Sequence, residues 1–238
     1  LPISREFGLE QLIARGEEDA TRRRHANWYL RLAEEGWRML ASRTDQGTWL
    51  DRMEREHGNL RAALAWLDDI GDTESALRLA GHLFWFWYVR GHLVEGQQWL
   101  ERALERGRGA PPDARATALL GLAVLAHWQG DDARATPCLE ECLQLSRQID
   151  DTWLTAFALG ILGVVAEDSG EFATSLPLQE EARRLFDAIG DRSNAALSLT
   201  HQGVVAWGAG DLPRARHLLE DALRTQREVG DTWAASVS

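Results

Sequence analysis

The stretch that decides the fold is VVAWGAGDLPRARHLLEDALRTQREVGD, residues 204–231. Two near copies precede it: VLAHWQGDDARATPCLEECLQLSRQID begins at Val124, and VVAEDSGEFATSLPLQEEARRLFDAIGD begins at Val164. The three copies start 40 residues apart. Self-similarity at a fixed period of this size is typical of solenoids, in which each unit buries its apolar face against its neighbours. The sequence therefore predicts a stack of repeated units.

Each unit is predicted to contain two helices. In unit 151–190, apolar residues recur at helical spacing from Trp153 to Val165 and again from Leu176 to Ile189. Gly-Asp pairs separate the helices, because Gly adopts the left-handed conformation that ends one helix and Asp accepts hydrogen bonds from the amides that open the next. We expect an all-α fold, a right-handed superhelical solenoid of antiparallel helix pairs with repeats of about 40 residues.

Small residues recur inside the predicted helices. Gly163 and Gly203 lie in first helices, and Ala182 and Ala222 lie in second helices, where a missing side chain lets two helices approach closely. With the turn glycines, this pattern resembles the tetratricopeptide repeat, with units longer than the usual length of about 34 residues. The predicted array covers residues 71–238, with units 72–109, 113–150, 151–190 and 191–230 and the start of a further unit at 231–238.

Residues 1–70 are predicted to be helical without following the repeat, as a coupling or capping segment. The string EREHGNLRAALAW, from Glu54 to Trp66, is the most specific part of a second resemblance. It is similar to the region that follows the nucleotide-binding and winged-helix modules in bacterial signal-transduction ATPases of the STAND class, which include LuxR-type and antibiotic-regulator-type transcription factors. This resemblance implies that an upstream ATPase module of the same chain is the first partner.

Composition narrows the function further. The chain has 26 Lys+Arg and 37 Asp+Glu, a net charge of −11, which disfavours direct nucleic-acid binding. No apolar run is long enough to span a bilayer and no signal-peptide pattern opens the chain, so we expect no membrane association and a cytoplasmic location. The first residue is Leu1 and the last residues begin a repeat, so we expect a piece of a longer protein.

No motif in the sequence predicts catalysis, a cofactor or a metal. Adjacent carboxylates recur at the same place in three units, at Glu140, Glu180 and Glu220, which favours a solvated helix face over an active site. Cys138 and Cys142 have no further ligand nearby at zinc spacing, so we expect free thiols. The chain lacks H-E-x-x-H, G-x-S-x-G and glycine-rich phosphate loops, and we predict that it is not an enzyme.

The residues that vary between copies are the candidate binding residues. In tetratricopeptide superhelices the first helix of each unit lines a concave groove, and this resemblance places the residues just before the inner turn there. Aromatic side chains in a groove suit an apolar ligand or a partner helix, although several of them could instead pack between units. The candidate groove residues are Trp85, Tyr88, His127, Trp128, Glu167, Asp168 and Trp207.

Two functions follow from these patterns. The first is a non-catalytic sensor or scaffold arm of a larger STAND-type regulator, which binds a protein partner or small-molecule inducer in the groove. The alternative is a free-standing adaptor that binds a peptide or partner helix. Tetratricopeptide adaptors that hold a peptide's carboxylate resemble one another in placing Lys, Arg and Asn in the groove, whereas this chain has no Lys and its predicted groove is aromatic and acidic.

Overall fold

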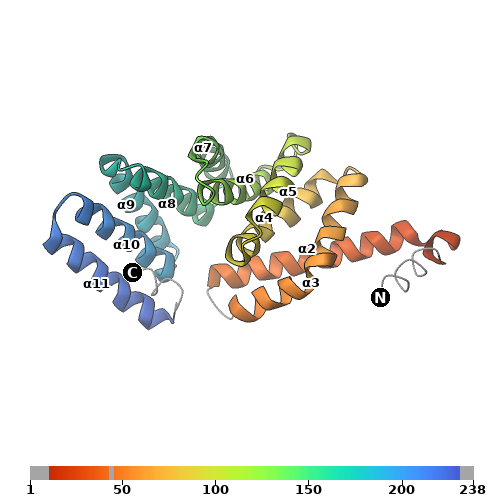
Figure 1. Ribbon diagram of the computed structural model, residues 1–238, viewed down its shortest axis with the longest axis horizontal. Coiled ribbons are helices and arrows are strands. Elements are labelled where there is room, and N and C mark those ends of the chain that lie inside the picture. The colour runs from red at the N-terminus through yellow and green to blue at the C-terminus, as the bar shows by residue number, and fades with distance from the viewer. Residues whose placement is uncertain (1–10, 43–45, 231–238) are drawn as a thin grey trace.

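The computed structural model describes residues 11–42 and 46–230, and all the regular secondary structure within these residues is helical (Figure 1). The predicted start of a further unit at 231–238 lies outside the described residues. The helices are α2 (Glu18–Ser42), α3 (Gln46–Asp69), α4 (Thr73–Arg90), α5 (Leu93–Arg106), α6 (Pro112–His127), α7 (Asp132–Gln148), α8 (Thr152–Asp168), α9 (Phe172–Ala188), α10 (Arg192–Gly208) and α11 (Leu212–Val229).

Successive helices pack as pairs, α4 with α5, α6 with α7, α8 with α9 and α10 with α11, and each pair also contacts the next. Figure 1 shows these pairs arranged as an arch, with the long helix α2 running beneath the limb formed by α4 and α5, and α3 packs against α2 and α4. The predicted fold, an all-α solenoid of antiparallel helix pairs, is confirmed.

The turns confirm the predicted role of the Gly-Asp pairs. The inner-turn glycines Gly130 and Gly210 have φ of 78° and 81°, which is the left-handed region. The next residues, Asp131 and Asp211, each accept a hydrogen bond from the backbone amide three positions later. Two outer turns depart from this pattern. After α7, Asp150 occupies the left-handed position with φ 55°, where the turns after α3, α9 and α11 have Gly, and after α5 the C-cap Gly107 has φ −90°.

Small residues allow the two helices of a repeat to approach closely, as predicted. A β-carbon at Gly163 would lie 2.5 Å from the amide nitrogen of Gln179, and one at Gly203 would lie 2.8 Å from Leu219. Ala182 is fully buried. In the pairs α8–α9 and α10–α11, a glycine of the first helix therefore packs against a larger side chain of the second.

The Glu54–Trp66 string forms the middle of α3 and binds α2. The Tyr29 hydroxyl on α2 donates to Glu56 at 2.5 Å, and the Asn59 amide donates to the same carboxylate at 2.8 Å. These two hydrogen bonds lower the pKa of Glu56. Burial, followed by the bond to Glu56, raises the pKa of Tyr29 to about 12. Leu60 and Leu64 of the string are buried in the core.

The two cysteines, Cys138 and Cys142, are not joined by a disulfide. Cys142 is fully buried, and burial raises the pKa of its thiol to about 12. Cys138 is half-buried, and burial raises its thiol pKa as well. A thiol with a raised pKa is a poor nucleophile, so neither residue has the environment of a reactive cysteine.

Candidate binding groove

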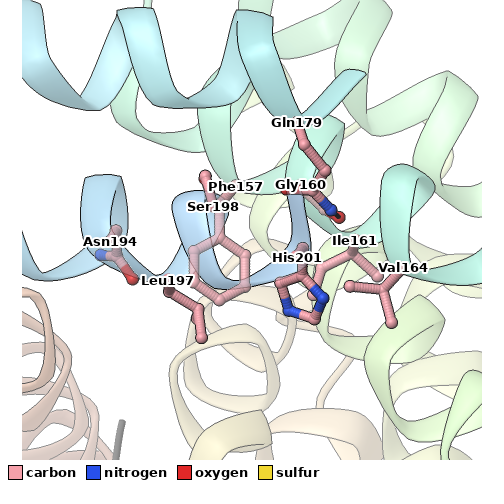
Figure 2. A pocket seen from close by; sticks show the side chains of 9 residues that line it. All are labelled: Phe157, Gly160, Ile161, Val164, Gln179, Asn194, Leu197, Ser198 and His201. Atoms are coloured by element: carbon pink, nitrogen blue, oxygen red, sulfur yellow. Dashed lines mark hydrogen bonds between the residues drawn. The ribbon is translucent and has the colours of Figure 1, made fainter. Parts of the chain in front are cut away.

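A small pocket lies between α8 and α10, the first helices of the last two described units (Figure 2). Its volume is about 40 Å³. A water molecule needs roughly 10–15 Å³ of such space, so the pocket has room for one small group, such as the tip of a side chain. The lining residues are Phe157, Gly160, Ile161 and Val164 of α8, Gln179 of α9, and Asn194, Leu197, Ser198 and His201 of α10.

Gln179 is one of four polar residues in the pocket lining, with Asn194, Ser198 and His201. Its side chain is fully buried, and its amide nitrogen donates to the Gly160 carbonyl at 2.9 Å. Since a carbonyl only accepts, this bond fixes which end of the amide is nitrogen, and the oxygen Oε1 has no hydrogen-bond partner among the described residues. Figure 2 shows the amide end among the pocket side chains. A buried acceptor without a partner costs about 1–3 kcal/mol, so a donor placed in the pocket would be favoured.

A histidine and a carboxylate meet at the pocket. His201, which lines it, has Nδ1 at 3.1 Å from the Glu167 carboxylate. Only 10% of the Glu167 side chain is exposed. Glu167 was among the candidate groove residues, and the structure places it against the α10 helix through this pair.

Three of the candidate aromatic residues form one strip. The rings of Trp85 and Tyr88 on α4 have centroids 5.2 Å apart, and Tyr88 lies 5.2 Å from Trp128 at the end of α6. Trp128 remains 53% exposed, whereas Trp85 and Tyr88 are half-buried. Burial raises the pKa of the Tyr88 hydroxyl. This strip therefore presents one open indole supported by two packed rings.

His127 precedes Trp128 in the sequence, but its side chain is almost completely buried. It is 7% exposed, its Nδ1 lies 2.6 Å from Asp132, and its Nε2 lies 3.3 Å from Asp168. Both ring nitrogens thus face carboxylates, one at the start of α7 and one at the end of α8. This geometry suits a side chain that holds two repeats together. Of the residues in this cluster, Asp168 is the accessible one, with 59% of its side chain exposed.

Trp207 lies apart from the other candidates. It is 66% exposed and lines a separate open cavity of about 400 Å³ between α10 and α11, together with Leu212, Leu219 and Leu223. Because α11 is the last described helix, this cavity lies on the end face of the described array, not between two first helices.

The sequence reasoning missed the pocket residues Val164, Leu197 and Gln179. It placed the groove at the last turn of each first helix, whereas the pocket lies one to three turns earlier. A signal was present: Gly163 and Gln179 are complementary in size, and a buried glutamine opposite a glycine is unusual in an apolar helix pair.

The N-terminal helix pair also reaches the first helices of the repeats. Trp37 near the end of α2 has its ring 5.4 Å from Phe84 on α4 and 5.2 Å from Trp153 on α8. Trp153 stacks on the pocket residue Phe157 at 4.9 Å, and its indole nitrogen donates to Asp191 at 3.0 Å. A continuous set of aromatic contacts therefore connects α2 to the pocket.

Comparison with known families assigns the repeat. Residues 114–188 and 154–228 each match the model of the tetratricopeptide repeat. The two matches together span residues 114–228. The tetratricopeptide repeat fold is generally non-catalytic and suited to protein–protein interaction. Among the described residues, no helix is both long and apolar enough to cross a lipid bilayer.

The chain is also similar in sequence to transcriptional regulators and in fold to solved structures. HTH-type transcriptional regulators of Mycobacterium bovis and Mycobacterium tuberculosis are 32% identical over 171 residues, which is 68% of this chain and 19% of each regulator. The chain thus spans about a fifth of the length of these relatives. The structure of BtubC from P. vanneervenii has a TM-score of 0.58 at 18% identity, covering 88% of this chain and 92% of BtubC. A kinesin light chain of TPR-like repeats from Podosopora anserina has a TM-score of 0.56 at 14% identity, covering 83% and 98%.

Proposed function

We propose that this chain is the non-catalytic sensor or scaffold arm of a larger transcriptional regulator, and that it binds a protein partner or inducer in its concave groove. The observation that carries the proposal is the pocket between α8 and α10, where the buried Oε1 of Gln179 lacks a hydrogen-bond partner among the described residues and lies near the apolar side chains of Phe157, Ile161 and Val164. The group that fits is small and apolar, and it carries an N–H or O–H donor. A side chain of a bound peptide or helix meets these conditions more easily than a whole metabolite, because the pocket holds only about 40 Å³.

The exposed indole of Trp128 and the carboxylate of Asp168 extend the proposed binding surface. An aromatic face next to a carboxylate favours a ligand that has an apolar part and a cationic part. Trp85, Tyr88 and Glu167 would support these contacts from beneath, since they are half-buried or paired. We keep Trp207 as a candidate contact for whatever packs on the end face of the array.

Binding in the pocket could reach the rest of a regulator through α2. Phe157 lines the pocket and stacks on Trp153, which contacts Trp37 of α2. In the proposed arrangement, residues 1–70 couple the repeat array 71–238 to an upstream STAND-type ATPase module in the cytoplasm. A ligand shifts such a regulator only if it binds one state better than the other, and displacement of Phe157 supplies a difference of this kind.

Two observations support a regulator as the larger protein. The relatives from mycobacteria are named HTH-type transcriptional regulators, and this chain matches about a fifth of their length. The net charge of −11 disfavours DNA contact by the chain itself, so the DNA-binding and ATP-binding modules would lie elsewhere in the protein.

The test is a binding screen of the 238-residue chain by tryptophan fluorescence and thermal shift against a metabolite library and a peptide library. Gln179→Leu removes the Oε1 acceptor at nearly constant side-chain volume, and Leu197→Ala enlarges the pocket by shortening a side chain of its wall. Leu212→Ala, on the separate end-face cavity, is the matched control. A ligand that Gln179→Leu and Leu197→Ala both lose and Leu212→Ala retains supports the proposal. A ligand that binds all three variants equally places the site elsewhere, and no ligand in either library argues against groove recognition.

A further inference from the structure

Two short motifs face each other where the N-terminal helices meet the first repeat. Glu54 and His57 lie three residues apart on α3, and His92 and Glu95 lie three residues apart at the start of α5. They pair crosswise: His57 Nε2 lies 3.0 Å from Glu95 Oε1, and His92 Nε2 lies 3.1 Å from Glu54 Oε2. Two imidazoles and two carboxylates from separate helices thus converge on one place.

The two imidazole rings are held in position by packing. Their centroids are 4.3 Å apart, and Phe86 of α4 contacts both, at 5.3 Å from His57 and 5.4 Å from His92. His57 is 8% exposed. Because packing holds the rings, a nitrogen of each imidazole already lies within 4.8 Å of the other before any ligand arrives, which is the preorganisation that a metal site needs.

The spacing suits a metal ion after a small adjustment. One ligand atom each from Glu54, His57 and His92 lie within 4.8 Å of one another. Zinc–nitrogen and zinc–oxygen bonds of about 2.0–2.2 Å require ligand atoms roughly 3.3 Å apart in a tetrahedron. Glu54, with 45% of its side chain exposed, can turn inward from its pair with His92, and small rotations of the imidazoles complete the adjustment.

We propose that Glu54, His57 and His92 bind a divalent first-row transition metal, with Zn²⁺ the expected ion. Two imidazole nitrogens with a carboxylate suit Zn²⁺ and its neighbours, whereas Mg²⁺ and Ca²⁺ prefer oxygen ligands alone. Binding of the ion to Nε2 would replace the hydrogen bond between each imidazole and its carboxylate. Glu95, which also receives the Arg61 guanidinium at 3.1 Å, lies beside His57 and helps neutralise the charge of the ion.

A metal at this place ties α3 to the turn between α4 and α5. The site joins the helices that precede the repeats to the first described repeat pair, so ion binding stabilises the junction and not the repeat stack itself. This inference does not depend on the proposed groove function, since its residues are distinct from those of the pocket.

The test is a titration of the tag-free, chelator-treated chain with Zn²⁺ by calorimetry and thermal shift. We expect one ion per chain and a rise in Tm of about 5 °C at a hundredfold excess over Kd. His92→Gln and Glu54→Gln should each weaken binding at least tenfold. His217→Gln is the matched control, because His217 forms an exposed pair with Asp221 at 3.7 Å and should bind like the wild type.

Zinc X-ray absorption identifies the ligands directly. Two histidines per ion in the wild type and one in His92→Gln support the proposal. Wild-type affinity in both His92→Gln and Glu54→Gln, or no saturable zinc binding by the wild-type chain, would overturn it. Since Glu54 is a surface residue and Gln has its shape, Glu54→Gln keeps the test valid if the histidine variant folds poorly.

Discussion

The repeat pairs α8–α9 and α10–α11 and the N-terminal junction of α2, α3 and α5 are held together by different means. In the repeats, one device recurs: a glycine in the first helix receives a larger side chain from the second, as Gly163 receives Gln179 and Gly203 receives Leu219. At the junction, each contact occurs once, as with the Tyr29–Glu56 hydrogen bond and the crossed His–Glu pairs. Repetition makes the array predictable from sequence, whereas the junction depends on particular residue pairs.

The largest effect should come from filling a glycine in the repeats. Gly163→Ala places a β-carbon 2.5 Å from the Gln179 amide, so the buried side chain must shift, and we expect a loss of about 1–3 kcal/mol in the free energy of unfolding. The measurement is urea denaturation followed by circular dichroism.

Gly160→Ala is the matched control, three residues earlier on the same helix. A β-carbon there has its nearest neighbour, Ala182, at 4.0 Å, so this variant should gain up to about 1 kcal/mol from helix propensity. Equal destabilisation by both substitutions would mean that these glycines are needed for the backbone conformation and not for the space they leave to a neighbouring side chain. Size-matched packing would then not be what distinguishes the repeats from the junction.

At the junction, Tyr29→Phe should cost about 1–2 kcal/mol, because it removes a hydrogen bond to an ionised carboxylate. The effect should depend on pH. The pKa of Glu56 is lowered in the folded state, so the stability from this pair is present above the unfolded carboxyl pKa and is lost as pH falls through the folded value. We expect the difference between variant and wild type in urea denaturation to shrink in acid.

Tyr88→Phe serves as the control, since Tyr29 and Tyr88 are the two tyrosines of the chain and the pKa of Tyr88 is raised by burial. Its stability difference from wild type should stay constant across the same acid range. If both variants lost the same stability with the same pH dependence, the Tyr29–Glu56 bond would not be what distinguishes the junction.

The same contrast explains what could be predicted from the sequence. The 40-residue period and the turn pairs Gly130-Asp131 and Gly210-Asp211 specify local geometry directly, because conformation and capping depend on neighbouring residues alone. The crossed pairing of His57 with Glu95 joins residues 38 apart, and no local pattern indicates it. Similarly, the pocket depends on the angle between α8 and α10, which side-chain packing sets, so Gln179 and Leu197 could not be singled out from their spacing.

The smallest effect on stability should come from exchanging Asp and Gly at the left-handed position of the outer turns, which tests whether these turns are equivalent. Asp150 adopts φ 55° at the outer-turn position that Gly71, Gly190 and Gly230 occupy after α3, α9 and α11. The left-handed region costs a residue with a β-carbon about 1 kcal/mol, and a part of this is recovered in Asp, whose short side chain tolerates the conformation. Asp150→Gly removes this cost but adds conformational freedom to the unfolded chain, so we expect the free energy of unfolding, measured by heat or urea, to rise by about 0.5 kcal/mol.

Gly190→Asp makes the reverse change in the next outer turn, where a β-carbon would meet nothing within 4 Å, so any loss of stability there comes from the backbone alone. Opposite signs at the two turns would show that they are interchangeable units. A loss at both would mean that Asp150 has acquired a contact of its own and that the array carries position-specific features like those of the junction.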